Sequence, residues 1–268
     1  KMWISSGDQD VSDNIVHLVL AKIPDADGNL PVGSGGISLF IVPKINLDGS
    51  QNDVTVAGLN HKMGFRGIPN CALNFGENGG AVGWRIGEAG AGLKQMFQMM
   101  NEARIMVGLC GAALAYRGYM HSVNYARERT QGRAMTQKSG GQIPIIAHAD
   151  VKHMLLKQKV FGEGGLALVF YAAMLVDLGD EESELLLGLL TPIVKTWSSE
   201  QGLIANDQAI QVHGGYGYTR DFAVEQLLRD NRLNPIHEGT TGIQAMDLLG
   251  RKLLMSDGRA LDLLQKRM

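Results

Sequence analysis

The sequence predicts an α+β protein in which a partial small β-barrel or β-sheet domain is followed by an all-α helical bundle. The first third of the 268-residue chain holds short β-branched runs broken by turn residues, and many of the chain's 35 glycines fall between Gly28 and Gly92. After Trp84, apolar residues recur at helical spacing instead. We therefore expect a β domain over residues 1–86 and a helical domain over residues 87–268.

Four runs in the first domain predict β-strands. Each combines β-branched or aromatic residues with flanking Gly, Pro, Asn or Asp, a pattern typical of strands bounded by turns. They cover residues 15–20, 37–42, 54–56 and 71–75. The chain begins with Lys1-Met-Trp-Ile-Ser, which has neither an initiator methionine nor a signal-peptide pattern. We interpret it as a piece of a longer protein that begins inside a strand.

Helical periodicity predicts three long segments in the second domain. The first two cover about residues 90–127 and about residues 147–178, and the acidic stretch 177–184 separates the second from the third. Thr191-Pro192 either kinks the third helix or starts a new one, because proline is tolerated at a first helical position. The buried face of this region is expected to carry Ile193, Trp197 and Ile204.

A polar turn containing Glu238 precedes the last substantial helix, which we expect Thr241 to cap and which we expect to run through Leu254. A carboxylate in this place has two interpretations. Taken alone, Glu238 is a solvated loop residue or a charge at a helix N-terminus, as most acidic residues are. Taken with the motifs around it, Glu238 is a catalytic base that the turn presents.

The composition argues against several classes of function. A net charge of −2 and a pI of about 6.4 argue against a cationic surface for nucleic acid. Cys71 and Cys110 are too few for a disulfide framework or a zinc site, and they fit the reducing cytoplasm. His148 and His153 are spaced for different sides of a helix, so no metal site is expected. No run of about 18 apolar residues is found, so no membrane span is expected.

Four motifs occur in order along the chain. They are Lys1-Met-Trp-Ile-Ser-Ser-Gly7, the segment 64–75 beginning Gly-Phe-Arg-Gly, the segment 211–221 beginning Gln-Val-His-Gly-Gly, and Asn234-Pro-Ile-His-Glu-Gly-Thr-Thr-Gly-Ile-Gln244. Together they resemble the flavin-dependent acyl-CoA dehydrogenase family over essentially the whole chain. The resemblance implies a middle β domain over residues 1–86, truncated at its N-terminus, and a C-terminal helical domain over residues 87–268. Segments 25–36 and 242–252 resemble the longer bacterial branch that includes 3-methylmercaptopropionyl-CoA dehydrogenase.

The resemblance assigns the catalytic base to Glu238. In the family this base removes the α-proton of an acyl-CoA thioester while the β-hydrogen leaves as hydride to flavin N5. Hydrogen-bond donors at the developing enolate oxygen assist such a step. A minority of the family places the base on the long helix, directly before the arginine that matches Arg104. That position is Ala103 here and Glu102 is one residue away, so Glu238 is favoured.

The resemblance also implies the cofactor and substrate contacts. Trp3 and Ser5 take the places of the tryptophan beside the flavin ring and of the hydroxyl residue near N5. The segment from Tyr125 to Gly132 resembles the arginine-bearing helix end that binds the FAD pyrophosphate of the neighbouring subunit. The further FAD contacts are Arg129, Gln131, Gln211, Gly214, Gly215 and Thr240, and the substrate contacts are Arg104 and His237. No metal is implied.

These matches imply an FAD-dependent enzyme of fatty acid β-oxidation that acts on an acyl-CoA and passes electrons to an electron-transfer flavoprotein. Because Arg129 and Gln211 resemble residues that serve a partner subunit's cofactor, a homodimer or homotetramer is expected. The piece itself is expected to be incomplete for catalysis. Three alternatives stay open: an acyl-CoA oxidase that uses oxygen, a DNA-associated member of the same superfamily, and a non-enzymatic helical interaction module.

Overall fold

A computed structural model describes residues 2–136 and 139–268 of the chain, and it confirms the α+β class. Lys1, which opens the first motif, lies outside the described residues. The chain divides into two compact units that meet between residues 100 and 101. Strand β6 (Trp84–Ile86) ends at the predicted boundary of 86/87, and helix α1 (Gly92–Glu128) begins in the first unit and continues into the second. The boundary of the domains at 86/87 stays a prediction.

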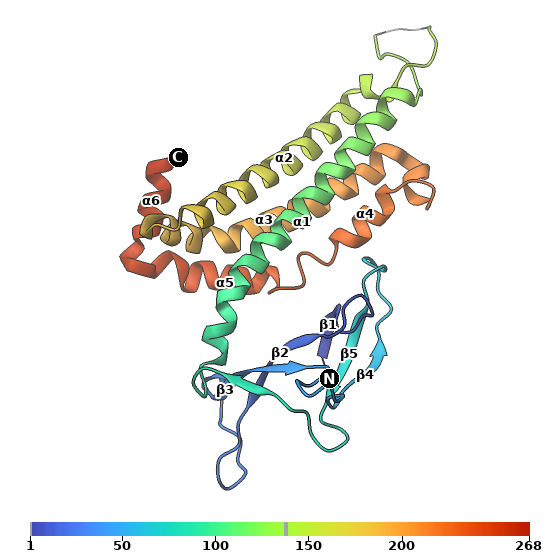
Figure 1. The fold of residues 1–268 in the computed structure, drawn as a ribbon. Coiled ribbons are helices and arrows are strands. Elements are labelled where there is room, and N and C mark those ends of the chain that lie inside the picture. The colour runs from blue at the N-terminus through green and yellow to red at the C-terminus, as the bar shows by residue number, and fades with distance from the viewer. Residues whose placement is uncertain (1, 137–138) are drawn as a thin grey trace. The chain divides into compact units, whose positions relative to one another are not determined.

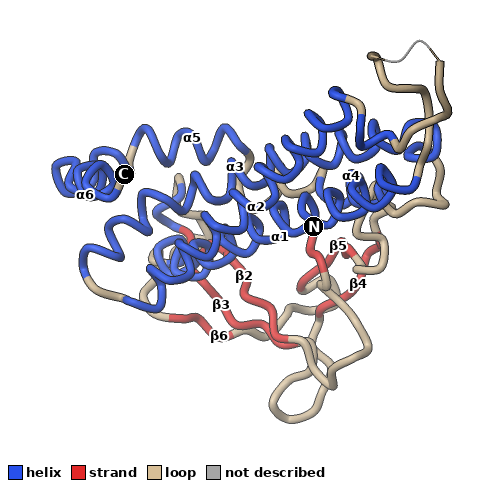
Figure 2. The backbone as a smooth tube through the Cα atoms, turned by 90° about the horizontal axis from the view of Figure 1, so that it is seen from above, coloured by secondary structure: helices blue, strands red, loops and turns tan. Residues whose placement is uncertain are grey.

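The first unit contains two three-stranded antiparallel sheets, drawn in red in Figure 2. Their orders are β1-β5-β4 and β2-β3-β6, and among the described residues they form no closed barrel. The strands other than β6 are β1 (Met2–Ser5), β2 (Val16–Lys22), β3 (Ile37–Pro43), β4 (Val54–Leu59) and β5 (Asn70–Phe75). The four runs predicted from the sequence are therefore confirmed. The sequence did not predict β6, because its three residues are too few for an alternating pattern.

The second unit is a helical bundle in which α1, α2 (Ala149–Leu178) and α3 (Glu181–His213) run side by side (Figures 1 and 2). Pro192 lies inside α3, which continues through it rather than starting there. Three shorter helices follow, α4 (Val224–Asn231), α5 (Thr241–Gly250) and α6 (Arg259–Arg267). The predicted end at Leu254 was wrong, because the α-helix stops at Gly250 and 3-10 turns cover residues 252–258.

Two apolar clusters form the core of the bundle. One joins Ile105 of α1 to side chains such as Leu175 of α2 and Leu186 of α3. The other joins Val123 of α1 to side chains that include Val212 of α3. Burial of apolar surface in these clusters stabilises the bundle by roughly 25 cal/mol per Å².

Small and polar residues, not large apolar ones, form the buried face of α3 between these clusters. A Cβ built on Gly111 would lie 2.8 Å from the Ser198 carbonyl oxygen, and one built on Gly202 would lie 2.5 Å from the Gly111 carbonyl oxygen. Because the backbones approach this closely, larger side chains do not fit at the crossing. The prediction of a buried Ile204 was wrong, since 45% of its surface is exposed. Ile193 and Trp197 are only partly buried.

The expectation that no segment is long and apolar enough for a membrane span is corrected by helix α2. By length and composition alone, α2 is long and apolar enough to cross a membrane, with a mean hydropathy of 1.5 over eighteen residues. The sequence test required an unbroken apolar run, whereas α2 carries isolated charged residues such as Glu163 and Asp177. The same helix packs within the bundle, where a Cβ on Gly162 would meet the Tyr116 backbone at 3.0 Å.

Candidate functional site

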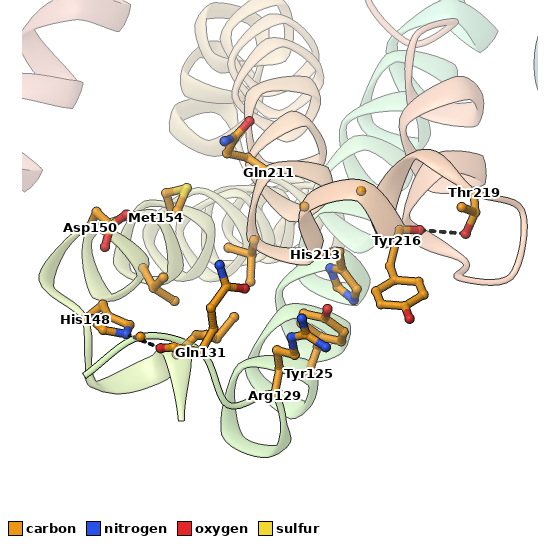
Figure 3. Close-up of a pocket in the computed structure, with 16 residues that line it drawn as sticks. Tyr125, Arg129, Gln131, His148, Asp150, Met154, Gln211, His213, Tyr216 and Thr219 are labelled. Atoms are coloured by element: carbon orange, nitrogen blue, oxygen red, sulfur yellow. Dashed lines mark hydrogen bonds between the residues drawn. The ribbon is translucent and has the colours of Figure 1, made fainter. Parts of the chain in front are cut away.

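A cavity of about 760 Å³ lies where the C-terminal ends of α1 and α3 meet the N-terminal end of α2 (Figure 3). Its volume is in the range of sites that hold a nucleotide-sized ligand. Five residues predicted as cofactor contacts line it together: Arg129, Gln131, Gln211, Gly214 and Gly215. The structure therefore brings together residues that are more than 80 positions apart in the sequence.

The segment after α1 is held at the cavity by backbone hydrogen bonds. The Ile145 N–H donates to the Arg129 carbonyl at 2.8 Å, and the Gln131 N–H donates to the Ile143 carbonyl at 3.0 Å. His148 Nε2 lies 2.8 Å from the Gln131 carbonyl oxygen. These contacts fix the backbone, while the side chains of Arg129 and Gln131 stay exposed and free to meet a ligand.

An aromatic group forms one wall of the cavity. The Tyr125 and His213 rings stack with centroids 4.4 Å apart, and Phe222 meets both rings in edge-to-face contacts. His213 donates from Nδ1 to the Ala209 carbonyl at 2.8 Å. Burial lowers the pKa of His213, and the Ala209 hydrogen bond opposes that shift. The ring is thus a neutral, fixed wall rather than a cation.

The backbone beyond α3 is open at the cavity. Gly214 has φ 61° and ψ −137°, a conformation that residues with a Cβ avoid. Nothing lies within 4 Å of a Cβ built on Gly214 or Gly215. This stretch therefore leaves room for a ligand to approach the backbone closely, while the Gly214 N–H itself donates to the Gln211 carbonyl.

The Glu238 turn lies apart from this cavity, between α4 and α5. Glu238 and Gly239 have φ values of 51° and 87°, so two consecutive residues are left-handed. Only the second is a glycine, so the turn places Glu238 in a conformation that non-glycine residues rarely adopt. The Glu238 side chain is exposed. Gln244 of α5 donates from Nε2 to the Glu238 carbonyl at 3.0 Å and to the Gly239 carbonyl at 3.3 Å.

Thr240, and not Thr241 as predicted, occupies the position before the first residue of α5, and its side chain makes no capping hydrogen bond. The exposed Thr240 therefore keeps its hydroxyl for other contacts. Thr241 instead donates from Oγ1 to Glu200 of α3 at 2.8 Å. This bond ties the start of α5 to α3, and sequence position alone could not show it.

A chain of buried asparagines lies beneath the turn. Asn234 donates to Asn231 at 2.9 Å, Asn231 donates to Asn206 at 2.6 Å, and Asn206 donates to the Leu114 carbonyl of α1 at 2.8 Å. At most 1% of each of these three side chains is exposed. His237 joins the chain through Nε2, which lies 3.2 Å from Asn234 Oδ1. Burial lowers the pKa of His237, so a neutral ring lies next to Glu238 in the turn.

Two buried cations lie near the turn, and the sequence pointed to only one of them. Arg104, predicted as a substrate contact, is 3% exposed and donates from Nη1 to Asp247 at 2.7 Å. Lys195 of α3 is fully buried and donates from Nζ to the Gly239 carbonyl at 2.7 Å. Burial and, to a smaller extent, the charge of Arg104 lower the pKa of Lys195 to about 8, while Glu238 and Glu200 oppose the shift. A lone lysine in a helix offers no sequence signal for such a role.

Trp3 and Ser5 lie in the first unit on β1, where Trp3 pairs with Ala72 and Ser5 with Asn70 of β5. The Trp3 side chain is 79% exposed, and Asn70 Nδ2 donates to Ser5 Oγ at 3.3 Å. Both residues therefore lie on an accessible strand. Their roles at the flavin stay predictions.

Comparisons with known proteins agree with the fold and the motifs. The family model for "Acyl-CoA dehydrogenase, C-terminal domain" matches residues 90–254. A 3-methylmercaptopropionyl-CoA dehydrogenase of Ruegeria pomeroyi is 40% identical over 271 residues, covering 97% of this chain and 45% of that protein. A butyryl-CoA dehydrogenase of Syntrophomonas wolfei is 40% identical over 276 residues, with coverage of 96% and 45%.

Among solved structures, ACDH-11 of Caenorhabditis elegans in complex with C11-CoA has a TM-score of 0.83. It is 29% identical, and the alignment covers 94% of this chain and 41% of that one. The chain thus spans about 45% of the length of the first two relatives.

Proposed function

Since the chain belongs to the acyl-CoA dehydrogenase family, we propose that it carries the base and part of the cofactor site of an FAD-dependent enzyme that dehydrogenates an acyl-CoA between Cα and Cβ. The observation that carries this proposal is the Glu238 turn. It holds an exposed carboxylate on a backbone that Gln244 and Lys195 fix from two helices. A base held in one direction needs little reorganisation before it accepts a proton.

The backbone of the turn also supports the proposal. Among the described residues, the Glu238 N–H donates to no other group. A free N–H beside the base is placed to donate to the thioester oxygen as negative charge develops there, which is the largest electrostatic help such a step receives. In this proposal Glu238 accepts the α-proton through its carboxylate, and its own N–H holds the enolate oxygen.

The cavity residues fit the phosphate-bearing part of FAD. The Arg129 guanidinium can donate two parallel hydrogen bonds to a phosphate, and the open backbone at Gly214 and Gly215 lets a phosphate approach closely. Gln131 and Gln211 add neutral donors and acceptors. When bound, FAD supplies the acceptor for the β-hydrogen that leaves as hydride.

A homo-oligomer is part of the proposal, with Arg129 and Gln211 serving the cofactor of a partner subunit. The outer side of α2 supports it, because several large apolar side chains there are exposed in a single chain. They are Leu156 at 60%, Val160 at 53%, Phe170 at 63% and Met174 at 45%. Such a surface on a helix is covered in most stable assemblies.

An electron-transfer flavoprotein is the proposed electron acceptor, and the second candidate function is an acyl-CoA oxidase. Both activities use the same base and the same FAD contacts. They differ only in whether oxygen or an electron-transfer flavoprotein reoxidises the reduced flavin. The test is to mix the full-length, FAD-loaded protein with a panel of acyl-CoA thioesters and to follow the flavin absorbance. Bleaching that persists in air until an electron carrier is added supports the dehydrogenase. Rapid return of absorbance in air supports the oxidase, and no bleaching with any thioester would contradict both.

A further inference from the structure

Lys195 is the largest side chain that is fully buried in the described part of the chain. A buried ammonium costs free energy unless nearby groups compensate it, so lysine is rarely buried without a reason. No ion pair of the described residues includes Lys195. Within the described residues its side chain donates to the Gly239 carbonyl, which belongs to the residue directly after Glu238.

The contact comes at the point where the turn is most strained. Glu238 is left-handed, and a side chain at position 239 would meet Gln244 Nε2 at 2.5 Å. Gln244 and Lys195 donate to two consecutive carbonyls, from α5 and α3. Holding both carbonyls inward fixes two consecutive peptide planes, the one between Glu238 and Gly239 and the one between Gly239 and Thr240. The backbone directly after Glu238 is therefore fixed, and this limits where its side chain can lie.

The two buried cations, Arg104 and Lys195, differ in how their charges are neutralised. Arg104 is neutralised by Asp247, and Asp247 also binds Arg251 at 2.6 Å. The Lys195 ammonium is compensated by the carboxylates of Glu238 and Glu200 without a direct ion pair. The charged or titratable groups that face this region are Arg104 of α1, Glu200 of α3, His237 and Glu238 of the turn, Asp247 of α5, and Arg251 and Lys252 beyond it.

We propose that Lys195 is a positioning residue for the Glu238 base: its buried hydrogen bond to the Gly239 carbonyl fixes the backbone from which the Glu238 carboxylate is presented. The inference rests on the proposed role of Glu238. It assigns a catalytic consequence to a buried side chain that touches neither substrate nor cofactor.

The test uses Lys195→Met in the full-length, FAD-loaded protein, with flavin reduction by acyl-CoA as the readout. The rate should fall by about tenfold to a hundredfold, as misplacement of a reacting group causes. The substrate KM should change far less. A merely structural lysine would lower the fraction of folded protein without separating the rate from KM in this way.

Lys252→Met is the matched control, because Lys252 is also a buried lysine whose pKa burial lowers, but its carboxylate neighbour is Asp247. This variant should keep the rate of flavin reduction. A second variant, Lys195→Gln, keeps an uncharged N–H donor for the Gly239 carbonyl on a side chain that is one atom shorter. It should recover part of the rate that Lys195→Met loses.

The outcomes separate this inference from the proposed function. If Glu238→Gln remains active, the base is elsewhere and the proposed function fails. If Glu238→Gln is inactive while Lys195→Met keeps a normal rate of flavin reduction, only the role of Lys195 is overturned. If neither Lys195 variant folds while Lys252→Met does, Lys195 serves the stability of the fold alone, and the inference is likewise overturned.

Discussion

The cavity at the end of the bundle and the Glu238 turn are built in opposite ways. In the cavity, the backbone is held by hydrogen bonds while Arg129, Gln131 and Gln211 remain exposed. At the turn, Glu238 and Thr240 are exposed, and the polar groups beneath them are buried and hydrogen-bonded. A site that binds a ligand needs free donors, whereas a site that presents a base needs a fixed backbone. The two regions therefore respond differently to mutation.

The largest effect is expected at the base. Glu238→Gln in the full-length protein keeps the shape of the side chain and removes its capacity to accept a proton. Flavin reduction by acyl-CoA should slow by at least about a hundredfold, the usual scale for loss of a general base. Stopped-flow absorbance measures this rate. Glu102→Gln is the control, and a loss of activity there with an active Glu238→Gln would move the base to α1.

A smaller effect is expected in the cavity. Arg129→Ala should raise the Kd for FAD by about tenfold to a hundredfold, which corresponds to the 1.5–3 kcal/mol of hydrogen bonds to a charged group. Fluorescence titration of the apoprotein measures it, and Arg127→Ala serves as the exposed neighbouring control. An unchanged Kd would show that the cavity does not hold the pyrophosphate.

The same variant tests whether the site is shared. Mixing Arg129→Ala with Glu238→Gln protein should restore part of the activity, because a heterodimer contains one site with both residues intact. A monomer by light scattering that still turns over acyl-CoA would contradict a shared site.

Substitutions in the asparagine chain beneath the turn should lower the stability of the fold more than they lower the catalytic rate. Asn206→Ala leaves Asn231 and the Leu114 carbonyl without their partner, so the free energy of unfolding should fall by about 1–3 kcal/mol. Urea unfolding followed by circular dichroism measures this change. The exposed Asp207→Ala should shift it by less than about 0.5 kcal/mol. Equal losses in both variants would show that the chain contributes nothing specific.

A further effect is a pH dependence of stability that Lys195 imposes. The native chain releases the Lys195 proton at a pKa of about 8, whereas the unfolded chain holds it up to about 10.5. The unfolded state binds more protons between these values, so raising the pH through this window stabilises the native state. Relative to Lys195→Met, the stability should rise by up to about 1.4 kcal/mol per pH unit. Parallel pH dependences of the two proteins would contradict a depressed pKa.

The sequence predicted the elements whose periodicity was strong, and it missed those set by tertiary contacts. The four strand runs, α1 and α2 follow local patterns, so their bounds were close to those observed. The buried face of α3 was mispredicted because glycine and serine at the helix crossing give no hydrophobic signal. For the same reason Lys195 escaped notice, since only the folded chain brings it to Gly239.

At the sites, motif order indicated which residues line the cavity, but it could not indicate how the turn is supported. Arg129 and Gln211 were grouped by resemblance, and the cavity contains both. The cap at Thr241 was misplaced by one residue because its hydroxyl bonds to Glu200 on another helix. Contacts between residues this far apart in the sequence cannot be predicted from the spacing of residues along the chain.

The crossing of α1 and α3, where glycines lie in the contact, also fixes the distance between the Glu238 turn and the cavity. Lys195, beneath the turn, and Gln211, at the cavity, lie on one continuous helix, about 24 Å apart at roughly 1.5 Å per residue. Because backbone touches backbone at Gly111 and Gly202, neither helix can slide without a clash. The crossing lies between the Glu238 turn and the cavity, so it holds the two regions at a fixed separation along α3.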